Sequence, residues 1–210
     1  REAGVGAALL LGAALAAAGA SYQALFRNPL VSPDILGVSA GAGLGAVAGI
    51  FLSLPGAAIQ ATALAGGMGA VGIVMLVAAL VRNTDRTLTL VLIGVVIGAL
   101  AGAATSLLKV LADPYDQLPA ITFWLLGSLA SVTTADILPA LPAVGLGLVP
   151  LVLLRWRINV LSLGDEEARA LGIEAGRTRA LVIVSATLIT ASVTALAGVV
   201  GWVGLVIPHI

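Results

Sequence analysis

Four long stretches of the chain carry no charged side chain, and they limit the possible folds more than any other feature. Residues 3–26, 35–81, 87–108 and 180–208 contain no Asp, Glu, Lys or Arg. About 18 apolar residues in a row are enough for a transmembrane helix, so the longest run could form two. Only 10% of the residues are charged, against about 25% in soluble domains. The sequence therefore predicts an all-α fold, a polytopic bundle of transmembrane helices in a lipid bilayer.

The breaks between these runs divide the chain into six main spans. Prolines, charges and turn residues interrupt the apolar pattern at 27–34, 54–56 and 82–86. Residues 121–130 are apolar, but this segment is too short to cross a bilayer, and it predicts a re-entrant or interfacial helix. The predicted spans are 4–26, 35–52, 57–81, 88–111, 137–154 and 180–200.

Basic residues gather on one side of the membrane if these spans alternate in direction. The positive-inside rule makes the arginine-rich side cytoplasmic. The residues predicted on that side are Arg27, Arg82, Arg86, Arg155, Arg157, Arg169, Arg177 and Arg179. Those predicted on the other side are Arg1, Lys109, Asp113, Asp116 and Asp136.

Two predicted helices carry a glycine at every fourth position, which lies on one helix face. Small residues at this spacing let helix backbones approach closely in lipid, so these faces are predicted to pack against other helices. The alternative is that glycine is simply abundant, since the chain has 26. The glycines of the two faces are Gly37, Gly41 and Gly45, and Gly94, Gly98 and Gly102.

Two distant segments share a weak internal similarity. Residues 16–29 and 195–208 have two alanines, a glycine and a proline in common at one constant offset. The predicted topology runs the two copies in opposite directions, which is typical of the inverted repeats of transporters. A chance match between segments rich in small residues is the alternative.

The sequence lacks the residues that several functions require, among them nucleic-acid binding, ion coupling and ATP binding. The net charge is zero, so no nucleic-acid-binding surface is predicted, and the chain has no cysteine. No predicted span has an acid or base in its interior, and no phosphate-binding loop is present. His209 is the single histidine and is predicted at a helix end or in a loop, with no metal site. The chain is therefore predicted to move a substrate with energy supplied from elsewhere.

The segment 155–179 is predicted to lie outside the membrane and holds nearly half of the charged residues. Three acidic residues follow Gly164, where they would favour the start of a helix, and Leu171-Gly172 would end it. A short amphipathic docking helix on the cytoplasmic side is predicted. A solvated linker is the alternative.

Four segments, in this order, resemble the signatures of the FecCD-type permease family. Its members are transmembrane subunits of bacterial ABC importers for iron complexes, including vitamin B12, heme and ferric-siderophore permeases. The resemblance implies ten spans in a type II importer fold with an inverted repeat. Residues 1–210 would be one permease domain with six to seven spans, lacking the family's first span and last three. The segments are QALFRNPLVSPDILGVSAGAGLGA (23–46), FWLLGSLA (123–130), LSLGDEEARALGI (161–173) and GWVGLVIPHI (201–210).

The resemblance also implies the partners and the cargo. A homodimer in the cytoplasmic membrane of a bacterium or archaeon would carry a metal chelate: a ferric siderophore, heme or cobalamin. Two separate ATP-binding cassette subunits would bind ATP and magnesium, so this chain would be no enzyme and would hold no cofactor. A periplasmic binding protein would deliver the substrate. Molybdate or tungstate is the alternative cargo.

The resemblance implies roles for particular residues. The coupling helix that docks on the ATPase would use Asp165, Glu166, Glu167, Arg169, Leu171 and Gly172. The cytoplasmic gate would include Asn28, Pro29 and Leu30. The segment near the outer gate would include Asp113, Pro114 and Tyr115, and Arg1 would contact the binding protein.

Two other classes of protein could use a hydrophobic bundle of this kind. An ion-coupled secondary transporter would work without an ATPase, and the lack of charges inside the spans argues against it. An intramembrane enzyme or a structural membrane subunit would need catalytic residues in the spans or would have no substrate pathway. Co-purification of an ATP-binding subunit would separate these hypotheses.

Overall fold

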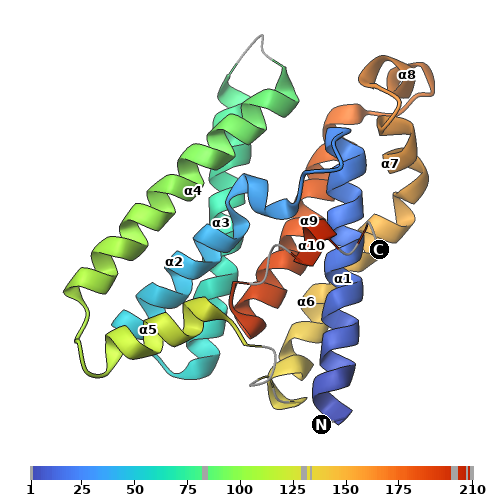
Figure 1. The fold of residues 1–210 in the computed structure, drawn as a ribbon. Coiled ribbons are helices and arrows are strands. Elements are labelled where there is room, and N and C mark those ends of the chain that lie inside the picture. The colour runs from blue at the N-terminus through green and yellow to red at the C-terminus, as the bar shows by residue number, and fades with distance from the viewer. Residues whose placement is uncertain are drawn as a thin grey trace.

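A computed structural model describes residues 2–81, 85–128, 132, 134–199, 203–206 and 208. The regular structure of these residues is entirely helical (Figure 1). The elements are α1 (Glu2–Phe26), η1 (Pro33–Leu36), α2 (Val38–Phe51), α3 (Gly56–Leu80), α4 (Arg86–Leu111), α5 (Gln117–Leu126), α6 (Thr134–Leu153), α7 (Arg155–Leu161), α8 (Asp165–Ala170), α9 (Ala175–Ala197) and α10 (Val203–Val206).

Membrane-length helices confirm the predicted polytopic bundle. Among the described residues, four helices are long and apolar enough to cross a bilayer: α3, α4, α6 and α9. The 25 residues of α1 extend about 38 Å at 1.5 Å per residue, which also exceeds the apolar thickness of about 30 Å. The boundaries of α1, α3 and α4 lie within two residues of the predicted spans.

The predicted span 35–52 is wrong as one continuous membrane helix. Gly37 lies in the left-handed region at φ 79° and separates η1 from α2. The carboxylate of Asp34 accepts a hydrogen bond of 3.1 Å from the backbone N–H of Ser39 and so caps the new helix. The 14 residues of α2 extend about 21 Å, which is too short to cross a bilayer.

The segment 112–136 contains the short helix that its apolar run predicts. Helix α5 has 10 residues and begins four residues earlier than the apolar run at 121–130. The side-chain amide of Gln117 donates a 2.9 Å hydrogen bond to the backbone carbonyl of Phe51, which fastens α5 to the end of α2. This helix lies across the ends of its neighbours in Figure 1.

Helix α9 lies at the centre of the bundle. It contacts α1, α2, α3 and α6, and 72% of its apolar window is buried, against 33%, 22% and 17% for α3, α4 and α6. It begins at Ala175, five residues before the predicted start at residue 180. The sequence-based boundary followed the arginines at 177 and 179, but Arg179 is buried inside the helix.

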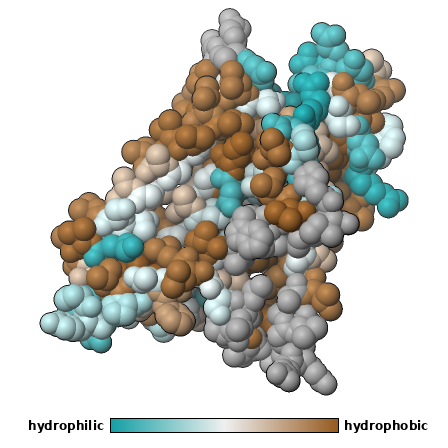
Figure 2. Space-filling view, viewed as in Figure 1, coloured by the Kyte–Doolittle hydropathy of each residue, from teal (hydrophilic) through white to brown (hydrophobic). Residues whose placement is uncertain are grey.

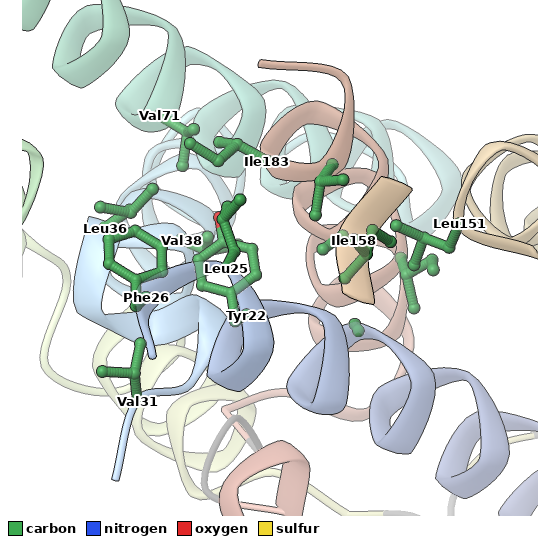
Figure 3. Close-up of a cluster of buried hydrophobic side chains, with 14 of the residues drawn as sticks. Tyr22, Leu25, Phe26, Val31, Leu36, Val38, Val71, Leu151, Ile158 and Ile183 are labelled. Atoms are coloured by element: carbon green, nitrogen blue, oxygen red, sulfur yellow. The ribbon is translucent and has the colours of Figure 1, made fainter. Parts of the chain in front are cut away.

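The main core joins α1 to α9 and to the η1–α2 break (Figure 3). Tyr22 is fully buried and stacks on Phe26 with a distance of 5.4 Å between ring centroids. The Tyr22 hydroxyl lies 3.5 Å from Oγ1 of Thr187 on α9. A polar contact inside an apolar core is favourable only when both groups are satisfied, so this pair fixes the register of α1 against α9.

The first glycine face brings two backbones into direct contact. A Cβ atom on Gly41 would lie 2.5 Å from the carbonyl oxygen of Gly66 on α3, and Gly45 likewise faces the backbone of Thr62. Such distances leave no room for a side chain. The structure therefore places Gly41 and Gly45 at the contact between α2 and α3.

The second glycine face is only partly covered by this chain. Gly94 packs against the backbone of η1, where its Cβ would lie 2.8 Å from the Cα of Leu36. A Cβ on Gly98 would lie 3.8 Å from the Cα of Gly37, which is an ordinary contact distance. A Cβ on Gly102 would meet nothing within 4 Å in the described part of the chain, so the predicted packing there is absent from these contacts.

The two ends of the bundle differ in charge. The C-terminal end of α1, the start of α4 and helices α7 and α8 share one end, and α5 lies at the other (Figure 1). Apolar side chains cover the outer surface of α4, and polar side chains gather over α7 and α8 (Figure 2). Arg27 after α1, Arg86 at the start of α4 and Arg169 in α8 thus lie at the end predicted to be cytoplasmic.

The two copies of the predicted repeat differ in local backbone. Ala16, Ala18 and Gly19 lie within the continuous helix α1. Their counterparts lie where α9 ends at Ala197, and Gly198 follows with φ 77° and ψ −161°. The similarity is therefore one of sequence and not of local conformation, and the inverted repeat stays a prediction.

Candidate functional site

Helix α8 is a single short helix with a well-formed C-terminal end. The backbone N–H of Gly172 donates to the carbonyl of Arg169 at 2.9 Å, and that of Ile173 donates to Ala168 at 2.8 Å. These two bonds form a Schellman motif, which needs a residue in the left-handed region after the helix. Gly172 supplies it with φ 74°. The predicted helix stop at Leu171-Gly172 is confirmed.

One face of α8 is anchored and the opposite face is free. Ala168 is fully buried, while Glu166, Glu167 and Arg169 are exposed. These three charged side chains have no ion pair within the described part of the chain. Leu171 beside them is 56% exposed. A capped helix with free charges and an uncovered leucine is suited to contact another protein.

Asp165 differs from the other acidic residues of α8 because it faces the bundle. Its carboxylate accepts two hydrogen bonds from the Arg179 guanidinium, at 2.8 and 3.4 Å. The Arg179 side chain is only 9% exposed and that of Asp165 is 41% exposed. This bidentate pair connects α8 directly to α9. The sequence gives no periodic signal for it, since the partners are 14 residues apart.

Asp165→Ala is expected to lower the free energy of unfolding by about 1–2 kcal/mol, because Arg179 would lose its charged partner while buried. Thermal unfolding of the purified protein in detergent measures this. The control is Glu174→Ala, which breaks the exposed 2.7 Å pair with Arg177 and is expected to cost less than about 0.5 kcal/mol. Equal losses in both variants would contradict a structural role for the buried pair.

The predicted gate residues form an exposed turn beyond α1. Arg27 lies in the left-handed region at φ 51°, and the Asn28 side chain accepts a 2.9 Å hydrogen bond from the N–H of Leu30. Leu30 is 77% exposed. A non-glycine residue in the left-handed region is uncommon, because this backbone conformation is strained and persists only where neighbouring contacts hold it. Such residues are frequent in the switch regions of proteins.

The gate turn and the coupling segment lie close together at the arginine-rich end. Arg27 Nη1 is 3.8 Å from the position that a Cβ on Gly164 would occupy. Helix α1 also contacts α7, which leads into α8. The structure therefore brings these two predicted sites together, although the sequence separates them by more than a hundred residues.

The segment near the predicted outer gate lies at the opposite end. Asp113 Oδ1 accepts 2.9 Å hydrogen bonds from the N–H groups of Tyr115 and Asp116, and so forms the turn before α5. Tyr115 is 87% exposed. The structure therefore gives Asp113 a local role in holding the turn, which its Asp-Pro sequence favours.

Asp113→Ala is expected to destabilise the protein by about 1 kcal/mol, because the N–H groups of the turn lose their acceptor. Asp113→Asn keeps an acceptor oxygen and is expected to stay within about 0.5 kcal/mol of the parent. Both are measured by thermal unfolding in detergent. Destabilisation of the asparagine variant to the level of the alanine variant would show that the charge, and not the acceptor, holds the turn.

Three residues singled out in the sequence lie outside the described residues. They are Arg1, predicted to contact a binding protein, Arg82, predicted on the cytoplasmic side, and His209, predicted at a helix end or in a loop. Asp34, in contrast, is a polar residue whose role the sequence did not predict. Its position five residues before Ser39, across the glycine break, is the signal that could have indicated a cap.

Comparison with known proteins gives a consistent result. The sequence profile of the FecCD transport family matches residues 1–210. A probable iron chelatin transport system permease protein of Helicobacter pylori is 41% identical over 204 residues, covering 97% of this chain and 61% of the relative. The molybdate import system permease protein MolB of Haemophilus influenzae is 38% identical over 203 residues, covering 97% and 60%. The hemin transport system permease protein HmuU of Yersinia pestis is 38% identical over 212 residues, covering 97% and 62%.

A solved structure has the same fold. It is an inward-facing conformation of a metal-chelate type ABC transporter, superposes with a TM-score of 0.91 and is 37% identical in sequence. The match covers 100% of this chain and 67% of the other. The chain thus spans about three fifths of the length of the curated relatives it matches.

Proposed function

The chain belongs to the FecCD transport family, and we propose that it is the transmembrane permease subunit of a binding-protein-dependent ABC importer. The observation that carries this proposal is α8, with Glu166 and Glu167 exposed, and without an ion pair to any described residue, at the arginine-rich end of a multi-pass membrane protein. A separate ATPase subunit would dock there and would bind ATP and magnesium. This chain would supply the pathway and no catalytic residue.

The docking role of α8 follows from how the helix is held. Its C-terminal end is fixed by the Schellman motif and its N-terminal end by the pair between Asp165 and Arg179. A helix fixed at both ends moves with the elements to which it is attached, α7 and α9. Force applied by an ATPase at Glu166 or Glu167 would therefore reach the buried helix α9 and the gate turn beside Arg27.

The proposed cytoplasmic gate and the proposed homodimer are both inferred from apolar side chains that this chain leaves exposed. Leu30 is 77% exposed at the arginine-rich end, and much of the outer face of α4 is uncovered by this chain. Two copies around a central pathway would let the turn from Asn28 to Leu30 meet its counterpart and close the inner end. We therefore propose a homodimer in the cytoplasmic membrane, with a periplasmic binding protein at the end that carries Tyr115.

A metal chelate is the proposed cargo, carried inward. Relatives named for iron chelatin and hemin transport, and the metal-chelate type transporter with the same fold, support it. The MolB relative supports molybdate as a second candidate at almost the same identity.

Uptake into proteoliposomes tests the proposal. The full-length protein is purified together with its proposed ATP-binding subunit and binding protein, and uptake of a ferric siderophore, hemin or molybdate is measured. Uptake of one chelate that needs ATP inside and the binding protein outside is expected. Uptake that follows an ion gradient without the ATPase would overturn the proposal in favour of a secondary transporter. Uptake of molybdate alone would keep the importer and correct the cargo.

A further inference from the structure

A cavity of about 200 Å³ opens between three helices at the arginine-rich end. Its walls come from the end of α3, the start of α4 and the first turns of α9. They are mostly apolar, with Met75, Leu90 and Ile183 among them, and the charged residues that line it in the described part of the chain are Arg86 and Arg179. Arg86 has no acidic partner among the described residues, and Asp165 occupies only the two terminal nitrogens of Arg179, so the described lining is complementary to an anion.

Arg179 enters this cavity with part of its hydrogen-bonding capacity unused. Arg179 as a whole is 8% exposed, and its two terminal guanidinium nitrogens donate hydrogen bonds to the carboxylate of Asp165. Its Nε is buried and has no hydrogen-bond partner in the described part of the chain. An unpaired buried donor is unfavourable, so an acceptor that reached this group would be favoured.

Arg86 reaches across the cavity from the other side. It is exposed at the first residue of α4, and its Nη1 lies 3.2 Å from where a Cβ on Gly176 of α9 would be. No acidic group pairs with it among the described residues. The neighbouring carboxylate of Asp85 is already engaged by the N–H groups of Thr87 and Leu88.

The position of the cavity selects among anions. Leu76 and Leu80, on the membrane-length helix α3, are exposed and follow the lining residues Met75 and Ala79 in the sequence. A free phosphate would lose water to apolar walls that offer it no hydrogen bonds. A phosphodiester with attached acyl chains would place its charge at the arginines and its apolar part on these leucines. Basic pockets between helices at the cytoplasmic surface bind lipid head groups in this way.

We propose that this cavity binds an anionic phospholipid from the leaflet at the arginine-rich end, with its phosphate between Arg86 and Arg179. Since Arg179 also holds Asp165, a bound lipid would share a residue with the anchor of α8. The binding site itself depends only on the helices being in a membrane. It would therefore stand if the proposed transport function failed.

Lipid retention measured by native mass spectrometry tests this site. The purified full-length protein is titrated with phosphatidylglycerol, phosphatidylcholine or inorganic phosphate. Phosphatidylglycerol is expected to bind at least about tenfold more tightly than phosphatidylcholine, and Arg86→Gln is expected to remove about that factor, as the loss of one charge-assisted hydrogen bond implies. Thermal unfolding confirms that the variant is folded.

Arg177→Gln is the matched control, because it removes the same charge at the same end from a residue outside the cavity that pairs with Glu174 on the surface. It is expected to leave phosphatidylglycerol binding unchanged. If both variants lost phosphatidylglycerol binding equally, the lipid would be attracted to the charged end of the protein as a whole, and the proposed site would be overturned. Displacement of the lipid by millimolar inorganic phosphate would overturn it in favour of a free-anion site.

Discussion

Replacing Glu166 and Glu167 together by lysine is expected to lower ATP-driven uptake at least tenfold while the protein stays folded in the membrane. Both side chains are exposed on α8 and have no ion pair within the described residues, so their change breaks no ion pair there. Reversal of two charges at a docking surface places like charges against the partner, and one misplaced charge there typically costs well over 1.4 kcal/mol, the equivalent of a factor of ten.

The measurement is uptake into proteoliposomes beside the ATPase rate of the same complex. Loss of uptake with a retained basal ATPase rate is the expected pattern, since hydrolysis would belong to the partner subunit. Glu174→Lys is the control, because Glu174 is exposed at the same end but lies beyond α8. Normal uptake by the double variant would exclude α8 as the coupling element.

Gly66→Leu is expected to destabilise the fold strongly, because Gly66 faces the backbone of α2 without room for a side chain. A Cβ at Gly66 would contact the carbonyl of Gly41 and lie 3.1 Å from the Cα of Gly45. Both neighbours are backbone, so no side chain can rotate away and α2 would have to separate from α3. Overpacking of a core usually costs about 1–3 kcal/mol, and a clash with fixed backbone is expected at the upper end of that range or beyond.

Size-exclusion chromatography in detergent and thermal unfolding measure this loss. The control is Gly72→Leu, six residues further along the same helix, where a Cβ would meet nothing within 4 Å in the described part of the chain. This variant is expected to resemble the parent. If both variants lost the same yield and stability, the effect would come from glycine content and not from the close approach of α2 and α3.

The sequence predicted the elements whose signal is continuous. Long runs without charge located α1, α3 and α4 to within two residues, because burial of charge in lipid is so unfavourable that a span must end where the charges begin. The short helix α8 was also predicted, because its acidic start and its Leu171-Gly172 stop are signals that lie within the segment itself.

The failures share a different cause, which is side-chain and backbone contacts that hydrophobic periodicity does not report. Arg179 was predicted outside the membrane helix, but Asp165 pairs with it and lets α9 start earlier. The break between η1 and α2 depends on the carboxylate of Asp34, which satisfies a freed backbone N–H, and periodicity does not report such a bond. Gly102 fits the repeat of its helix face, yet whether it packs depends on what lies opposite.

Helix α2 is too short to cross the bilayer, and this has a consequence for how the protein is inserted into the membrane. A segment that extends only about 21 Å cannot stay in the bilayer alone when it leaves the insertion machinery. The carbonyls and glycines that join it to α3 are available only after α3 has been synthesised. The two helices are therefore expected to enter the membrane as a hairpin, with α3 as the part that retains it, so that the membrane-embedded break at Gly37 forms after translation of its neighbour.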